Sequence, residues 1–129
     1  MAAPGIGRPP LGRRGMTSLS THVLDTTHGR PAAGVAVRLA AADGTPLFAG
    51  VTDADGRCSG LPTLAPGRYA LAFAVAAYFR STGVVLPDPP FLDIVTVDFG
   101  IADGGSAGAG HYHVPLLVSP FGYATYRGS

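Results

Sequence analysis

The sequence contains no Lys, no Glu and no Trp, and it has a single Cys. All nine basic residues are Arg and all eight acidic residues are Asp. Lys and Glu favour helices, whereas the abundant Gly, Pro and Asp favour turns. These absences favour a fold of short strands joined by tight turns over a helical one.

The lone Cys58 excludes an intramolecular disulfide, so the chain lacks the framework typical of small secreted domains. No apolar run approaches the roughly 20 residues that a membrane span requires. Residues 1–15 lack the apolar segment of a secretory signal. We therefore expect a cytoplasmic protein without a membrane partner. One thiol beside Arg57 is a weak indication of a nucleophile, and we expect Cys58 to lie in or near the core.

Positive charge is scarce outside the N-terminal segment. Three Arg and no Asp lie in residues 1–15, which leaves six Arg against eight Asp, or −2, in the rest of the chain. Nucleic-acid binding needs an excess of positive charge to neutralise phosphates, so we expect no nucleic-acid partner. We expect residues 1–17 to form a disordered extension and residues 18–129 to form one domain.

Alternation of apolar and polar residues predicts the strands. In residues 18–25, Leu19, Thr21 and Val23 share one face while His22 lies on the other. Residues 68–75 give the clearest pattern, with Leu71 and Phe73 on a shared inward face. Further strands are predicted over residues 35–39, 46–52, 92–99, 111–118 and 122–127.

Residues 76–83 lack alternation, contain alanines and end at Gly83, which predicts one short helix. Asp43-Gly44 predicts a hairpin. Turn signals recur about every 8–12 residues, as is typical of all-β sandwiches. The predicted fold class is all-β, a two-sheet antiparallel sandwich of about eight strands with one short helix.

His111 and His113 lie two residues apart on a predicted strand and therefore project from the same face. Such a pair can bind zinc, but a zinc site needs a third protein ligand, and Cys58 is isolated in the sequence. We favour the alternative that both are hydrogen-bonded polar groups, and we predict no metal site.

Two further polar residues follow turns, where a solvent-exposed role is the ordinary one. Arg57 comes directly after the turn at residues 53–56, and His28 lies in the turn cluster at residues 26–31. By contrast, residues 126–129 bring a phenol, a guanidinium, a hydroxyl and a carboxylate into four positions. That density suggests a site near the end of the chain.

Several segments together resemble the transthyretin-related 5-hydroxyisourate hydrolases. The final Tyr-Arg-Gly-Ser is the feature that separates these hydrolases from the hormone carrier transthyretin. The resemblance runs from about residue 19 to residue 129, and it is carried by residues 19–25, 29–32, 52–57, 90–92 and the run from His111 to Ser129.

The resemblance implies a transthyretin-like sandwich of two four-stranded sheets, assembled as a homotetramer with active sites in a channel between dimers. The implied reaction is hydrolysis of 5-hydroxyisourate, the product of urate oxidation, at a cyclic amide to give 2-oxo-4-hydroxy-4-carboxy-5-ureidoimidazoline. No cofactor is expected. The alternative is a transthyretin-like carrier that holds a small ligand in the same channel without turnover.

The resemblance also implies site residues by position. The catalytic set is His22, Arg57, His113 and Ser129, and the substrate-binding set is His22, Arg57 and Tyr126. A neutral imidazole can take a proton from water, which leaves His22 and His113 both open as the general base. Arg57 would bind substrate oxygens and stabilise the developing oxyanion, and Ser129 would orient the water or the base.

Overall fold

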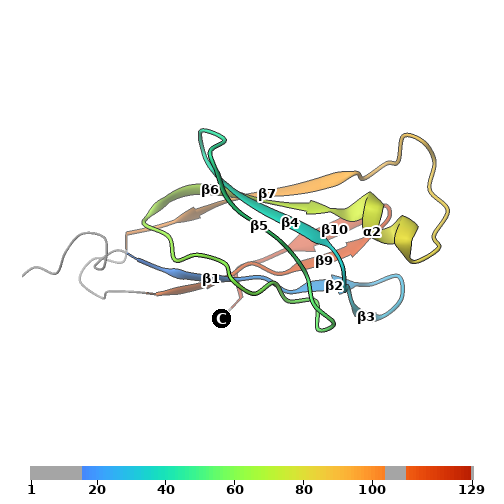
Figure 1. Cartoon of the computed structure of the whole chain (residues 1–129), viewed down its shortest axis with the longest axis horizontal. Coiled ribbons are helices and arrows are strands. Elements are labelled where there is room, and N and C mark those ends of the chain that lie inside the picture. The colour runs from blue at the N-terminus through green and yellow to red at the C-terminus, as the bar shows by residue number, and fades with distance from the viewer. Residues whose placement is uncertain (1–15, 104–109, 129) are drawn as a thin grey trace, which may run out of the picture.

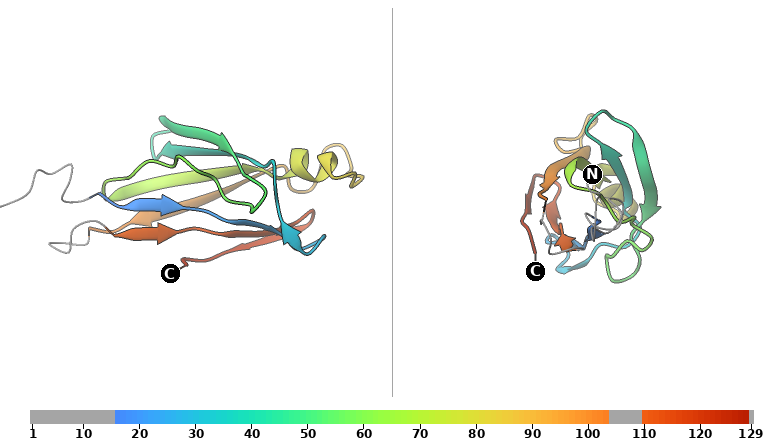
Figure 2. Two further views of the ribbon diagram at one scale, coloured as in Figure 1. Left: turned by 60° about the horizontal axis from the view of Figure 1, so that its bottom comes forward. Right: turned by 90° about the vertical axis from the view of Figure 1, so that its left-hand side faces the viewer.

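The computed structural model describes residues 16–103 and 110–128, so residues 1–15 of the extension expected at residues 1–17 lie outside the described residues. Figures 1 and 2 show two layers of strands, with helix α2 (Val75–Ser81) at one end. Within the described ranges, no helix is long and apolar enough to cross a membrane. Thr17 already pairs with the rest of the chain, because its N–H donates to the carbonyl of Leu64 at 2.8 Å.

The first layer is a four-stranded antiparallel sheet built from the middle of the chain. The hairpin predicted at Asp43-Gly44 joins its first two strands, and Gly44 adopts a φ of +91° that favours glycine. In spatial order the strands are β5 (Pro46–Val51), β4 (Ala36–Ala41), β6 (Gly67–Ala74) and β7 (Ile94–Ile101).

The second layer joins both ends of the described chain. Its four-stranded part is extended by a two-stranded part, since the N–H of Val114 donates to the carbonyl of Ser20 at 2.9 Å. The four-stranded part runs β10 (Gly122–Thr125), β9 (Leu116–Ser119), β2 (Val23–Asp25), β3 (Arg30–Pro31), and the two-stranded part pairs β1 (Ser18–Ser20) with β8 (His111–His113).

The core lies between the two layers and confirms the predicted inward faces. Leu71 and Phe73 of β6 are fully buried, as is Leu39 of β4. Val23 and Leu116 face them from the second layer, each fully buried. Burying one such aliphatic or aromatic side chain contributes about 1.5–3 kcal/mol. Apolar alternation therefore fixes which face of each strand points inward.

The predicted two-sheet sandwich with one short helix is confirmed, with one difference in strand direction. The pairs β1 with β8 and β2 with β9 are parallel. Alternation determines which face is buried but not the direction of the partner strand, so the sequence pattern did not show this. The expected single strand at 111–118 is also divided, because Pro115 has no N–H to donate to a ladder.

The last strand of the first layer begins two residues later than predicted, at Ile94 rather than residue 92. The carbonyl of Asp93 accepts hydrogen bonds from the N–H groups of Val75 at 3.0 Å and Ala76 at 3.1 Å. Because Asp93 satisfies the first turn of α2, it is unavailable to the ladder. The helix predicted at residues 76–83 is confirmed as α2.

A buried carboxylate links the helix to the second layer. Asp25 is 1% exposed, and it accepts hydrogen bonds from the Tyr78 hydroxyl at 2.7 Å and the His28 N–H at 3.0 Å. Burial opposes ionisation of Asp25, but these hydrogen bonds and the nearby His28 ring outweigh it and lower the pKa of the carboxyl. Burial and the contact with Asp25 raise the pKa of Tyr78 to about 12.

We expect Tyr78→Phe to lower the free energy of unfolding by about 1.5–3 kcal/mol at neutral pH, because it removes a hydrogen bond to a buried charge. Asp25 has a lowered folded-state pKa, so its contribution is present above its unfolded pKa of 3.8 and is lost as the pH falls through the folded value. Urea unfolding at pH 7 measures the difference. Tyr123→Phe, at a side chain 49% exposed, is the control, and an equal loss in both variants would contradict the assignment.

Candidate active site

His22 lies on the outer face of the second layer, between β1 and β2. Its neighbours Thr21 and Val23 point into the core, where the Thr21 hydroxyl donates to the carbonyl of Val114 at 2.7 Å. The carbonyl of His22 accepts from the N–H of Leu116 at 2.9 Å. His22 is therefore held by its own backbone and by the buried residues on both sides.

Arg57 is brought beside His22 by a tight turn. The Asp53 carboxylate accepts the N–H groups of Asp55 at 2.9 Å and Arg57 at 3.1 Å, which closes the turn. Gly56 has a φ of +75°, and its carbonyl accepts the N–H of Val23 at 2.8 Å. A Cβ at Gly56 would lie 2.4 Å from the carbonyl oxygen of Val23, so only glycine fits. The backbones of Arg57 and His22 then form an antiparallel bridge.

His113 ends β8 and shares the outer face with His22. Its partner across the parallel pair is Ser20, whose Oγ lies 2.7 Å from Nδ1 of the His113 ring. On its other side, the carbonyl of His113 accepts the N–H of Gly128 at 2.7 Å. Backbone bridges join Arg57 to His22 and His113 to Gly128, and Arg57 and His22 lie close enough to His113 for their charge to act on its ring. We call these four residues the row, and the first three are residues of the predicted site.

Burial and the neighbouring positive charge favour the neutral form of the His113 ring. Its pKa is lowered below 6.5, first by burial and then by the positive charge of Arg57 and by the neighbouring His22 and His111. A neutral imidazole at neutral pH has a free lone pair and can accept a proton. In the described part of the predicted site, the imidazole of His113 can therefore accept a proton beside the positively charged guanidinium of Arg57.

We expect Arg57→Ala to raise the pKa of His113 towards its usual value, because the variant removes a positive charge that opposes protonation. Arg57→Lys keeps the charge and should preserve most of the lowering. NMR titration of the histidine ring signals measures the shift. Arg38→Ala, at an exposed position of β4 in the other layer, is the control. An unchanged His113 pKa in Arg57→Ala would contradict the charge coupling.

Gly128 belongs to the site although the sequence did not indicate it. A Cβ at this position would lie 2.5 Å from Cδ2 of His113, so the glycine allows the chain to pack against the imidazole. Gly128 precedes Ser129, the fourth predicted catalytic residue, which lies outside the described residues. In the sequence, the only indication was that Gly128 lies beside the polar residues at 126–129. The pairing with His113 shows why a residue without a side chain is needed there.

Tyr126, the predicted substrate contact, is placed differently from the two histidines. Its side chain is 57% exposed and lines a groove of about 240 Å³ together with Tyr112 and Phe99. The Arg127 guanidinium covers the Tyr112 ring, with Cζ 3.9 Å from the ring centroid. Tyr126 is thus exposed at a groove lined by residues of both layers.

Sequence reasoning also missed two serines. Ser18 Oγ lies 2.6 Å from Nδ1 of His111, and Ser20 Oγ lies 2.8 Å from Nε2 of the same ring. The spacing of Ser18 and Ser20 matches that of His111 and His113, but only the parallel register brings the pairs together. Within residues 16–103 and 110–128, no three His, Cys, Asp or Glu side chains gather as metal ligands.

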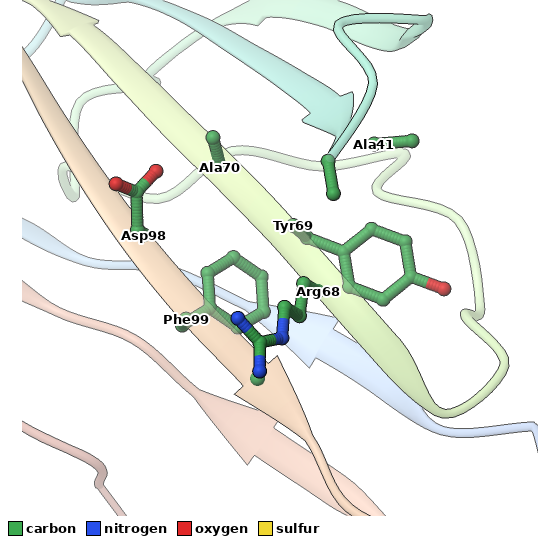
Figure 3. Close-up of a pocket in the computed structure, with 8 residues that line it drawn as sticks. Ala41, Arg68, Tyr69, Ala70, Asp98 and Phe99 are labelled. Atoms are coloured by element: carbon green, nitrogen blue, oxygen red, sulfur yellow. The ribbon is translucent and has the colours of Figure 1, made fainter.

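Other predicted candidates lie away from this row. Cys58 is buried, as expected, and burial followed by the charge of Asp53 raises the pKa of its thiol, so it stays protonated and unreactive. His28 contacts Asp25 in a surface turn. A hollow of about 580 Å³ on the first layer, lined by Arg68, Tyr69 and Asp98 among others, contains none of the predicted catalytic residues (Figure 3).

The sequence of the chain is similar to those of known hydrolases over most of its length. It is 49% identical over 119 residues to the 5-hydroxyisourate hydrolase of Caulobacter vibrioides, which covers 88% of this chain and 100% of that protein. The chain therefore aligns with the full length of that hydrolase.

Solved structures with the same fold include proteins of different named functions. A crystal structure of (S)-allantoin synthase superposes with a TM-score of 0.78 at 38% identity over 91% of this chain, which spans only 45% of that protein. Sea bream transthyretin in complex with thyroxine gives a TM-score of 0.73 at 34% identity, covering 85% of this chain and 93% of that one. The HIUase/Transthyretin family matches residues 19–128. The chain therefore belongs to the HIUase/Transthyretin family.

Proposed function

We propose that this protein hydrolyses 5-hydroxyisourate at a cyclic amide, giving 2-oxo-4-hydroxy-4-carboxy-5-ureidoimidazoline. The observation that carries the proposal is the proximity of Arg57 and His22 to His113: His22 is bridged to Arg57, and both lie close enough to His113 to act on its ring. The hydrolase relative, 49% identical over 119 residues, supports the same assignment. We further propose that the protein works without a cofactor.

In the proposed reaction His113 is the general base. Its Nδ1 is occupied by Ser20, which leaves Nε2 to take a proton from water as the water oxygen bonds to the amide carbonyl carbon. Arg57 stabilises the negative oxygen of the tetrahedral intermediate. The carbon–nitrogen bond then breaks, the carbonyl re-forms, and the leaving nitrogen takes the proton back from the imidazolium. His22, bridged to Arg57, binds and orients the substrate.

Two further roles are part of the proposal. Ser129 follows Gly128, which is paired with His113, and we assign it the orientation of the water or the base. Tyr126 has an exposed phenol with which to bind the polar ring of the substrate. Both roles rest on the resemblance of the terminal segment to the hydrolases.

We propose that the protein assembles as a homotetramer. Among the described strands, β7 and β10 lie at sheet edges, and Ile94 of β7 and Tyr123 of β10 are 56% and 49% exposed. Phe91 and Phe121 add two exposed aromatic rings whose centroids lie 6.4 Å apart. Unpaired edges beside apolar side chains favour association with further copies. Analytical ultracentrifugation should give four times the mass of one chain, and a monomer would refute the proposal.

The direct test of the activity generates 5-hydroxyisourate in the cuvette with urate oxidase and follows its absorbance. The decay should be faster with the protein than without it. A decay at the spontaneous rate, together with tight binding of a small aromatic ligand such as thyroxine, would instead support the carrier alternative. The charged and imidazole groups in the row favour turnover, since a carrier of apolar ligands needs a drier lining.

A further inference from the structure

Four side chains form a continuous line of hydrogen-bonding distances that leads to His113. Ser18 Oγ lies 2.6 Å from Nδ1 of His111, and Nε2 of His111 lies 2.8 Å from Ser20 Oγ. Ser20 Oγ lies 2.7 Å from Nδ1 of His113. Both nitrogens of His111 are thus occupied, while His113 has one nitrogen occupied by this line.

The parallel pairing of β1 with β8 produces this line. Ser18 is opposite His111 and Ser20 is opposite His113, so the four side chains stand on one face of the two-stranded sheet. Leu19 and Tyr112, between them, point to the core side. The spacing repeats every two residues on both strands, which fixes the alternation of hydroxyl and imidazole along the line.

Counting protons gives the line a direction. We assign the hydroxyl proton of Ser18 to the carbonyl of Gly110, 3.3 Å away, because a carbonyl can only accept; the Ser18 oxygen then accepts from Nδ1–H of His111. A neutral imidazole carries one N–H, so Nε2 of His111 must then accept the hydroxyl proton of Ser20. The Ser20 oxygen is left to accept a proton from Nδ1 of His113.

We propose that His111 is a positioning residue for the hydrolysis, acting through Ser20 to keep the proton of His113 on Nδ1 and the lone pair on Nε2. This proposal extends the proposed function and rests on it, because the lone pair on Nε2 matters only if His113 is the general base. In the other tautomer, Nε2 would carry the proton and could not take one from water. His111 itself touches no substrate in this assignment.

The test separates the tautomer from the activity. At pH 8, nitrogen-15 NMR of the wild-type histidine rings should show His113 protonated on Nδ1. Ser20→Ala and His111→Phe should each show a mixture of the two His113 tautomers, and Ser119→Ala, a serine of β9 that bonds within its own turn, should match the wild type. An unchanged His113 tautomer in both variants would overturn the proposal, whether or not the protein hydrolyses 5-hydroxyisourate.

The kinetic test asks whether His111 acts through Ser20. His111→Phe should lower kcat about tenfold with little change in KM, because part of the protein then holds the inactive tautomer. In the Ser20→Ala background the same substitution should have no further effect, since the connection is already broken. Additive losses in the double variant, or a loss confined to KM, would contradict a positioning role.

Discussion

Replacing His113 with Ala is expected to slow the enzymatic hydrolysis of 5-hydroxyisourate by about 10²–10⁴-fold, the range that a general base contributes. The variant removes the proton acceptor but leaves the backbone pairing of β8 in place. His113 is only half-buried, so the thermal unfolding midpoint should change little. The measurement is kcat/KM on freshly generated substrate, with circular dichroism as the check on folding.

His28→Ala is the matched control, because it removes a histidine outside the row and should leave kcat/KM unchanged at a temperature where the protein is folded. The pH profile gives a second check. The base acts in its neutral form, so the rate should rise with pH through a value below 6.5 and level off by neutral pH. Full activity in His113→Ala would remove His113 from the mechanism.

Gly56→Ala should have a large effect although it leaves every functional side chain unchanged. The new Cβ would lie 2.4 Å from the Val23 carbonyl oxygen, at a φ of +75°. Left-handed strain costs about 1 kcal/mol and forced packing about 1–3 kcal/mol, so we expect the free energy of unfolding to fall by about 2–4 kcal/mol. Arg57 follows directly, and a displacement of about 1 Å should lower kcat/KM by up to about 10²-fold.

The control is Gly29→Ala, because Gly29 has a similar φ of +68° and a Cβ added there would have no atom within 4 Å. Gly29→Ala therefore introduces the backbone strain without a steric overlap of the new Cβ, and residue 29 lies outside the row. Urea unfolding and kcat/KM should therefore show a loss of about 1 kcal/mol and unchanged turnover. Equal losses of stability in the two variants would mean that the overlap at Val23 is relieved without cost.

The parts of the fold that depend on local pattern were predictable. Alternation identified Leu71 and Phe73 as core residues, and Gly83 after a run without alternation marked the end of the helix. Strand direction was not predictable, because nothing within residues 18–25 specifies a parallel partner near residue 111. The start of β7 depended on Asp93 bonding to the helix, which is a contact between separate elements.

The candidate site was also only partly predictable from the sequence. His22, Arg57 and His113 were identified by resemblance, and the structure brings these three together. The contributions of Ser20, Gly56 and Gly128 were not identified, because each depends on the approach of another strand. Ser129 and its role stay a prediction, as does the part assigned to Tyr126.

The parallel pairing of β1 with β8 also determines when the site can exist during synthesis. Ser18 and His111 are 93 residues apart, and so are Ser20 and His113. At about 5–20 residues per second, a ribosome needs roughly 5–20 s to make the intervening chain. During that interval β1 has no partner strand, and pairing over so long a separation is intrinsically slow. The row of catalytic groups should therefore form among the last events of folding, after the sheet of the first layer.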